Sequence, residues 1–232
     1  TAVFWGMLVA TFLGVFIIPG NFAFVEQLGR RHRRAKGPVK DVILKGDQID
    51  LHDLPQIVHH EGDAGVYLTS AISFAKDPTS ETWNCAYNRL MIKGRDTTSI
   101  HLTLGKHLWE FQRTAEARGE PLPVAFAIGV HPAIALGSLA IGSIDEDERA
   151  IMGALLGEPL ELVKCETSDV LVPAHAEMVI EAEILPGART PEGPFGEFTG
   201  YSLGQRDREV VKVKVEEVDG EDRVELWERE GA

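Results

Sequence analysis

Cysteine is scarce in this sequence: 232 residues contain only Cys85 and Cys165. The two lie far apart and form none of the short paired spacings that bind zinc or build a redox centre. This excludes a disulfide framework and is typical of a protein from a reducing compartment. Because 44% of the residues are hydrophobic, the chain has ample material for a core, as one large or two small domains.

Positive charge is scarce as well, since 23 Lys and Arg stand against 36 Asp and Glu, for a net charge of -13. Residues 1–40 hold six Lys and Arg and one Glu, so the remainder is more acidic still. Binding to a phosphate backbone needs Lys and Arg, which argues against nucleic acid as a partner. The only basic cluster, RRHRR at 30–34, is short, and we interpret it as a solvated turn or helix end.

A long uncharged run opens the chain, TAVFWGMLVATFLGVFII at residues 1–18, which ends before Pro19. Its length makes it a marginal membrane-spanning candidate, and the basic cluster would then lie on the cytoplasmic side. The alternative is a buried helix or strand. A cleaved signal peptide fits less well, because the basic cluster follows the apolar run. We expect a cytoplasmic protein, with membrane association through residues 1–24 as the alternative, and a natural N-terminus that lies upstream of Thr1.

Short apolar runs alternate with turn residues along the rest of the chain, without an internal repeat. Helices are predicted at 107–119, ending at Gly119, and at 143–157, with Ser143 and Glu146 as a capping box. Residues 36–65 are expected to form short strands and loops. Strands are predicted at 65–75, 84–94, 122–130, 176–185 and 208–218. Because strands outnumber helices without strict alternation, we expect an α+β fold with a largely antiparallel, barrel-like sheet.

The stretch EGPFGE at 192–197 follows the predicted strand at 176–185, separated from it by PGARTP at 186–191. Gly193 and Gly196 free the backbone and Pro194 removes a donor, so a turn is predicted rather than a helix. Such a turn can bring Glu192 and Glu197 to the same side. The sequence leaves two readings open: a solvated turn with two surface acids, or an acid/base pair.

Six segments in a fixed order resemble the UbiD family of decarboxylases, which use prenylated flavin mononucleotide. They are GVYLTS (65–70), NCAYNRLMIKG (84–94), GKHLWEF (105–111), AFAIGVHPAIALGS (125–138), LGEPLELVKCETSDVLVPAHAE (156–177) and EGPFGEFTGY (192–201). Each segment alone is a weak signal, whereas their common order and spacing over residues 38–218 make the resemblance specific.

The resemblance implies a split β-barrel of the flavin-reductase-like kind, with flanking helices and an N-terminal α/β segment. It divides the chain into an uncertain segment (1–35), an N-terminal α/β portion (36–83), a prenylated-FMN-binding barrel (84–218) and the start of a linker (219–232). Family members continue into a C-terminal domain that closes over the cofactor and forms the oligomer interface. We therefore expect a fragment of a longer frame or a subunit completed by another chain, and a homo-oligomer at full length.

The same resemblance implies a divalent metal, Mn²⁺ or Mg²⁺, held by Asn84, His107 and Glu148, which clamps the cofactor phosphate beside a K⁺ ion. It implies a catalytic set of Arg89, Glu192 and Glu197. Lys106 stands where the family usually has Gln and could pair with the phosphate directly. The implied cofactor contacts are Thr69, Ala86, Tyr87, Asn88, Arg89, Lys106, His107, Ser138, Leu139, Ala140 and Glu148.

The implied activity is reversible decarboxylation of an aromatic or α,β-unsaturated acid, through a cofactor–substrate adduct, loss of CO2 and protonation by Glu197. A flavin prenyltransferase would supply the cofactor. The alternative is a non-catalytic flavin-binding or assembly subunit that needs a partner chain. On its own, Glu148 would be read as an acid at a helix start, where it complements the helix dipole.

Overall fold

The computed structural model describes residues 32–33, 36–144, 146–197 and 199–214. Four sequence predictions lie outside this part or largely so: the apolar run at 1–24, most of the basic cluster, the segment 1–35 and the linker from 219. Within the described part, none of the helices combines the length and the apolar character needed to cross a bilayer.

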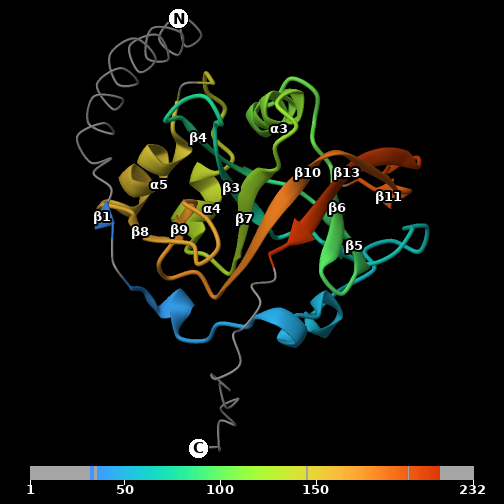
Figure 1. Cartoon of the computed structure of the whole chain (residues 1–232), viewed down its shortest axis with the longest axis horizontal. Helices are drawn as coiled ribbons and strands as arrows, with labels where there is room; N and C mark the ends of the chain where they lie inside the picture. The colour runs from blue at the N-terminus through green and yellow to red at the C-terminus, as the bar shows by residue number, and fades with distance from the viewer. Residues whose placement is uncertain (1–31, 34–35, 145, 198, 215–232) are drawn as a thin grey trace, which may run out of the picture.

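An antiparallel sheet of eight strands forms the centre of the molecule (Figure 1). Every pair of neighbours in it is antiparallel, and the sheet curls into an open half-barrel, which confirms the predicted α+β class with a largely antiparallel, barrel-like sheet. Its spatial order is β2 (Tyr67–Leu68), β5 (Leu90–Gly94), β6 (Thr97–Ile100), β13 (Arg206–Val213), β10 (Met178–Glu192), β7 (Leu122–Ile128), β3 (Ile72–Lys76) and β4 (Trp83–Tyr87).

Two smaller sheets and three helices complete the described fold. The small sheets are β1 (His32–Arg33), β8 (Glu161–Lys164) and β9 (Leu171–Pro173), and the hairpin of β11 (Phe195–Gly196) with β12 (Ser202–Leu203). The helices are α3 (His107–Ala117), α4 (Pro132–Gly137) and α5 (Glu148–Leu156).

The two faces of the large sheet pack into separate cores. In β7, Leu122, Val124 and Phe126 join the core beneath α3, whereas Ala125 and Ala127 join the core shared with α4, α5 and the β8–β9 pair. Successive strand residues point to opposite faces, so a continuous apolar run is the pattern expected of a strand covered on both sides. Figure 1 shows α3 apart from the α4–α5 layer, as this division requires.

The helix at 107–119 is confirmed, and Gly119 follows it in the left-handed region, at φ +69°. The second helix begins later than predicted, at Glu148 rather than Ser143. The carboxylate of Asp147 accepts from the backbone N–H of Arg149 at 3.0 Å and caps the helix there. The predicted capping box instead closes a turn before the helix, because Glu146 accepts from the N–H of Ser143 at 3.2 Å.

Two predicted strands are each broken in two. The segment 65–75 forms β2 and β3, and 84–94 forms β4 and β5. The hydroxyl of Ser73 donates to the side-chain oxygen of Asn88 at 2.7 Å, and the N–H of Asn88 donates to the Ala71 carbonyl at 3.3 Å. These bonds hold the chain at 88–89 out of the regular ladder, which periodicity alone did not reveal.

The other strand predictions differ mainly in length. The strand at 122–130 is confirmed, β10 is longer than 176–185 and ends at Glu192, and 215–218 lie outside the described residues. Residues 36–65 form three 3-10 turns, at Pro38–Lys40, Gly46–Gln48 and Leu51–Asp53, in place of short strands.

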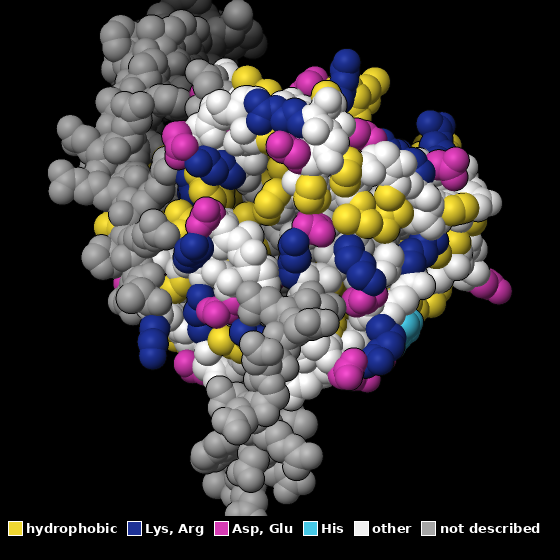
Figure 2. Space-filling view, in the orientation of Figure 1, with side chains coloured by type: hydrophobic (Ala, Val, Ile, Leu, Met, Phe, Trp, Pro, Cys, Tyr) yellow, Lys and Arg dark blue, Asp and Glu magenta, His cyan; other side chains and the backbone are white. Residues whose placement is uncertain are grey.

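Surface charges are mixed on the face shown in Figure 2, where basic and acidic side chains are interspersed. Pairs such as Lys212 with Asp96 (2.6 Å) and Lys76 with Glu81 (2.6 Å) are partly exposed. Each pair of this kind stabilises a protein by about 0–1 kcal/mol, so the two cores dominate the stability of the fold.

Both thiols should be unreactive in the native protein. Cys85 and Cys165 are 1% and 3% exposed, and burial raises the pKa of the Cys165 thiol far above its usual value. We expect Ellman's reagent to label neither cysteine at pH 8 within the time that labels both in denaturant. Fast labelling of the native chain would contradict this packing.

Candidate functional site

Arg89 lies between the two glutamates of the EGPFGE stretch. Its Nε donates to Glu192 Oε1 at 2.9 Å and its Nη2 reaches Glu192 Oε2 at 3.4 Å, while its Nη1 bonds Glu197. The strand break at 88–89 and the end of β10 bring these groups together from positions about a hundred residues apart. The pairing is unequal, because the Glu192 side chain is 2% exposed and that of Glu197 is 30% exposed.

The loop that carries the glutamates is anchored to the segment before β2. Asp63 accepts from the N–H of Gly196 at 2.8 Å, and the N–H of Ala64 donates to the Pro194 carbonyl at 2.9 Å. Phe195 packs with its ring 4.6 Å from that of Tyr67 and lies beneath the Arg89 guanidinium, at 4.5 Å. These contacts fix the loop in a single position relative to Arg89.

Burial in this region favours neutral forms of groups that lack a partner. Burial, and then the charge of Glu192, raise the pKa of Tyr67 to about 12. Tyr67 is therefore a neutral wall of the site at physiological pH rather than a base.

A second cluster joins Asn84 on β4, His107 at the start of α3 and Glu148 at the start of α5. Glu148 Oε1 accepts from the Asn84 amide at 3.0 Å and lies 3.6 Å from His107 Nδ1, and Glu148 Oε2 accepts from the N–H of Cys85 at 3.2 Å. Burial raises the pKa of Glu148, and the hydrogen bonds and the nearby His107 oppose this shift.

The three side chains of this cluster fit a hard divalent cation. Asn84 Oδ1 is buried and accepts no hydrogen bond from the described residues, so it is an oxygen that a cation could satisfy. An amide oxygen, an imidazole and a carboxylate suit Mn²⁺ or Mg²⁺ better than a thiolate site would. No group of three His, Cys, Asp or Glu gathers in the described part of the chain, so the candidate depends on the amide of Asn84.

The other residues predicted to contact the cofactor differ in their hydrogen bonds and in their exposure. Thr69 bonds His59 Nε2 through its hydroxyl at 3.0 Å, and the Ala86 carbonyl accepts from the Ser73 hydroxyl at 2.9 Å. Lys106 is exposed at the N-cap of α3, and Tyr87 is 37% exposed.

The predicted contacts after α4 offer little polar chemistry through their side chains. Ser138 donates to the Ala135 carbonyl of its own helix at 2.7 Å, and Leu139 is 59% exposed. This segment can therefore contribute backbone or apolar contacts, and Ala140 has no polar side-chain atom to add. The roles of all these residues toward a cofactor remain predictions.

Two residues next to the Arg89–glutamate cluster were not predicted from the sequence. Arg208 on β13 bonds Glu192 Oε2 through its Nε at 3.3 Å, and its Nη2 lies 3.3 Å from His101 Nδ1. The alternating pattern at 208–218 could have marked Arg208 as a charged residue on one face, but the face and the partner depend on strand register.

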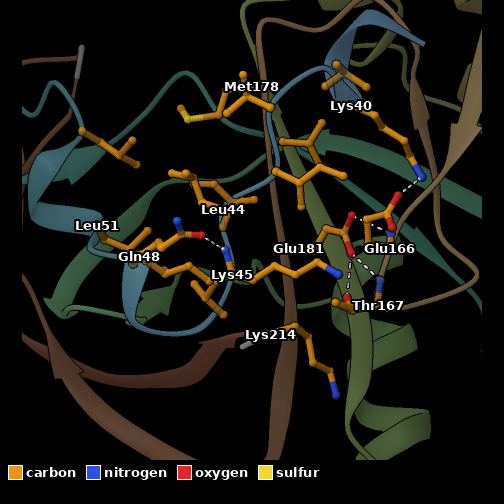
Figure 3. Close-up of a pocket in the computed structure, with 18 of the residues that line it drawn as sticks. Lys40, Leu44, Lys45, Gln48, Leu51, Glu166, Thr167, Met178, Glu181 and Lys214 are labelled. Carbon is orange, nitrogen blue, oxygen red and sulfur yellow. Dashed lines mark hydrogen bonds and ion pairs between the residues drawn. The ribbon is translucent and has the colours of Figure 1, made fainter. Parts of the chain in front are cut away.

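A separate cavity of about 380 Å³ lies between the 3-10 turns at 38–53 and the ends of β10 and β13. Figure 3 shows Leu44, Leu51 and Met178 around it, with Lys40, Glu166 and Glu181 at one side. None of the residues of the two clusters lines this cavity, so it is distinct from the candidate site.

Most of the chain matches a known protein family. Residues 30–218 match the UbiD family model, described as the 3-octaprenyl-4-hydroxybenzoate carboxy-lyase Rift-related domain. The chain is 36% identical over 170 residues to anhydromevalonate phosphate decarboxylase of Methanothermobacter thermautotrophicus, which covers 73% of this chain and 40% of that protein.

Two solved structures extend this similarity. The UbiD-class enzyme HmfF from Pelotomaculum thermopropionicum, in complex with FMN, superposes with a TM-score of 0.75 at 50% identity, over 79% of this chain and 41% of that one. The closed form of vanillic acid decarboxylase from Sedimentibacter hydroxybenzoicus gives 0.77 at 30% identity, over 83% and 43%. The chain thus spans about two fifths of the length of these relatives.

Proposed function

This chain belongs to the UbiD family, and we propose that it forms the cofactor-binding part of a prenylated-FMN-dependent decarboxylase acting on an aromatic or α,β-unsaturated carboxylic acid. The relatives named above include decarboxylases, and HmfF has also been solved, as an evolved dimeric form, in complex with prFMN. Because the chain spans two fifths of their length, the complete activity is proposed for a longer protein or for an assembly with a second chain.

The observation that carries the proposal is the unequal pairing of the two glutamates with Arg89. Glu192 is nearly fully buried and held by two guanidinium groups, which fix the position of its carboxyl group. Glu197 has one bond to Arg89 and is 30% exposed, so its carboxyl group is reached by solvent. Two acids with different environments on one arginine are an arrangement suited to acid/base work.

The chemistry requires one proton donor. Loss of CO2 leaves an electron pair on carbon, and that carbon must be protonated before the product leaves. We assign this proton to Glu197, with Arg89 and Glu192 orienting its carboxyl group. Run in reverse, Glu197 would accept the proton from the substrate carbon before carboxylation.

Asn84, His107 and Glu148 would hold Mn²⁺ or Mg²⁺, and that cation would neutralise a phosphate in this acidic chain. When bound, a prenylated flavin supplies the electron sink for decarboxylation. Asn84 and Arg89 are five residues apart, a span of at most about 18 Å. A ligand with its phosphate at the first cluster can therefore present its ring system at the second. The K⁺ ion rests on the family resemblance alone.

The test is to identify the small molecule that the purified chain releases after co-expression with a flavin prenyltransferase. We expect mass spectrometry to find prenylated FMN in stoichiometric amount together with Mn²⁺ or Mg²⁺. An empty chain whose C-terminally extended form is also empty would overturn the proposal. An empty chain with a loaded extended form would retain the function and assign cofactor retention to the longer protein.

A further inference from the structure

Arg208 occupies a defined place beside the carboxylate pair. In the β10–β13 ladder Glu192 pairs with Arg206, and Thr190 pairs with Arg208. Residues paired across an antiparallel ladder share a face, and so do residues two apart on one strand. Arg208 is therefore the diagonal neighbour of Glu192 on the site face, and its Nε lies 3.3 Å from Glu192 Oε2.

Arg208 adds a second guanidinium group beside Glu192. Both guanidinium groups are permanently protonated, and the Glu192 carboxyl group lies between them. With Glu197 ionised, Arg89, Arg208 and the two glutamates sum to zero; with Glu197 protonated, they sum to +1. Without Arg208 the formal charge of this set would be one unit lower in either state, so the site would attract an anion less strongly.

We propose that Arg208 is a positioning residue that holds the Glu192 carboxyl group in place and adds a positive charge to the site, which favours a carboxylate ligand. This inference rests on the proposed function for the identity of the substrate class. Its geometric basis, the contact of Arg208 with Glu192, is independent of any cofactor.

His101 reports directly on Arg208. Arginine can only donate, so the contact of Arg208 Nη2 with His101 Nδ1 at 3.3 Å makes Nδ1 the acceptor and places the imidazole proton on Nε2. Burial, then the charges of Arg89 and Arg208, lower the pKa of His101 to about 4. His101 is therefore neutral at pH 7 and adds no charge to the cluster.

Other titratable groups also face this cluster from each neighbouring element. Their effects on the pKa values in the site are weaker than burial, and they stay constant in the experiment below. These groups are Asp63 before β2, Tyr67 on β2, Lys93 on β5 and Arg206 on β13.

The first measurement is an NMR titration of His101 in the chain without cofactor. Arg208→Gln should raise the pKa of His101 from about 4 toward its ordinary value of 6.5 and allow the other tautomer. The control is Arg189→Gln, which removes an ion pair of β10 with Glu116 (2.9 Å) and should leave His101 unchanged. An unchanged His101 pKa in Arg208→Gln would overturn the assigned contact.

The second measurement uses benzoate as a carboxylate probe and benzamide as its uncharged counterpart, on the cofactor-loaded protein. Arg208→Gln should weaken benzoate roughly tenfold or more and leave benzamide unchanged, because a unit charge at contact distance is worth at least a factor of this order. Equal weakening of both ligands, or of neither, would overturn the charge role.

Arg208→Lys keeps the inference testable if the Gln variant does not fold. Lysine keeps the charge but cannot bridge Glu192 and His101 as the guanidinium does. Benzoate affinity should stay within about a factor of three of that of the unaltered protein by the same charge argument, while His101 loses its fixed tautomer. A roughly tenfold or greater loss of benzoate affinity in Arg208→Lys would contradict the proposal.

These outcomes separate the inference from the proposed function. If the loaded protein releases no CO2 from aromatic acids but benzoate binding still depends on Arg208, decarboxylation fails and the anion site stands. If the unaltered protein decarboxylates, and Arg208→Gln has the same KM for the acid and the same pH profile, the proposed function stands and this inference fails.

Discussion

Replacing Glu197 with Gln is expected to lower decarboxylation by a factor of about 10²–10⁴, the usual contribution of a positioned general acid. Gln keeps the size of the side chain and its hydrogen bond with Arg89, but it has no proton to give. Flavin content should stay unchanged, because Glu197 lies with Arg89 and not in the Asn84 cluster. CO2 release and flavin absorbance of the same sample measure the two quantities.

The matched comparison for this variant is Glu192→Gln, which touches the same arginine. Glu192 is 2% exposed between two guanidinium groups, so loss of its charge should reduce the free energy of unfolding by roughly 3 kcal/mol. Glu197 is 30% exposed, and its replacement should cost about 1 kcal/mol or less. Glu177→Gln, in an exposed acid before β10, is the control for a general effect of charge. Full turnover in Glu197→Gln would remove its role as proton donor.

Loss of cofactor and metal is the result expected of His107→Ala and of Glu148→Gln. Each variant removes one of the three groups that would hold the cation, so Mn²⁺ affinity should fall by more than the roughly 10–100-fold that loss of an outer partner costs. In the unaltered protein, Mn²⁺ at a hundred times its Kd should stabilise the fold by about 2.7 kcal/mol. Thermal unfolding with and without Mn²⁺ should show this gain only where all three groups are present.

Two controls distinguish a metal site from a structural cluster. His175→Ala removes an exposed histidine that pairs with Glu161 at 2.8 Å, and Mn²⁺ binding should not change. In the metal-free chain, burial raises the pKa of Glu148. Ionisation of this carboxyl group therefore lowers the free energy of unfolding as pH rises above the ordinary pKa of glutamate. Glu148→Gln should therefore leave metal-free stability at pH 7 equal or higher. Unchanged Mn²⁺ and flavin content in both cluster variants would contradict the assignment.

The sequence by itself determined the elements whose signal is local. The run at 122–130 contains a strand, and 107–119 contains a helix that ends just before Gly119, because apolar spacing and a left-handed glycine act within a few residues. The ordered motifs were enough to indicate the family. They also named the two sets, Arg89 with its glutamates and Asn84 with His107 and Glu148, that the fold brings together.

Only the tertiary structure decided the features that depend on distant contacts. The break at 88–89 follows from the bond between Ser73 and Asn88, and the late start of α5 follows from the cap at Asp147. Arg208 reaches Glu192 because of the register between β10 and β13, and a shift of one residue would turn its side chain to the opposite face. Register and burial are set by segments far apart in the chain, so no local pattern encodes them.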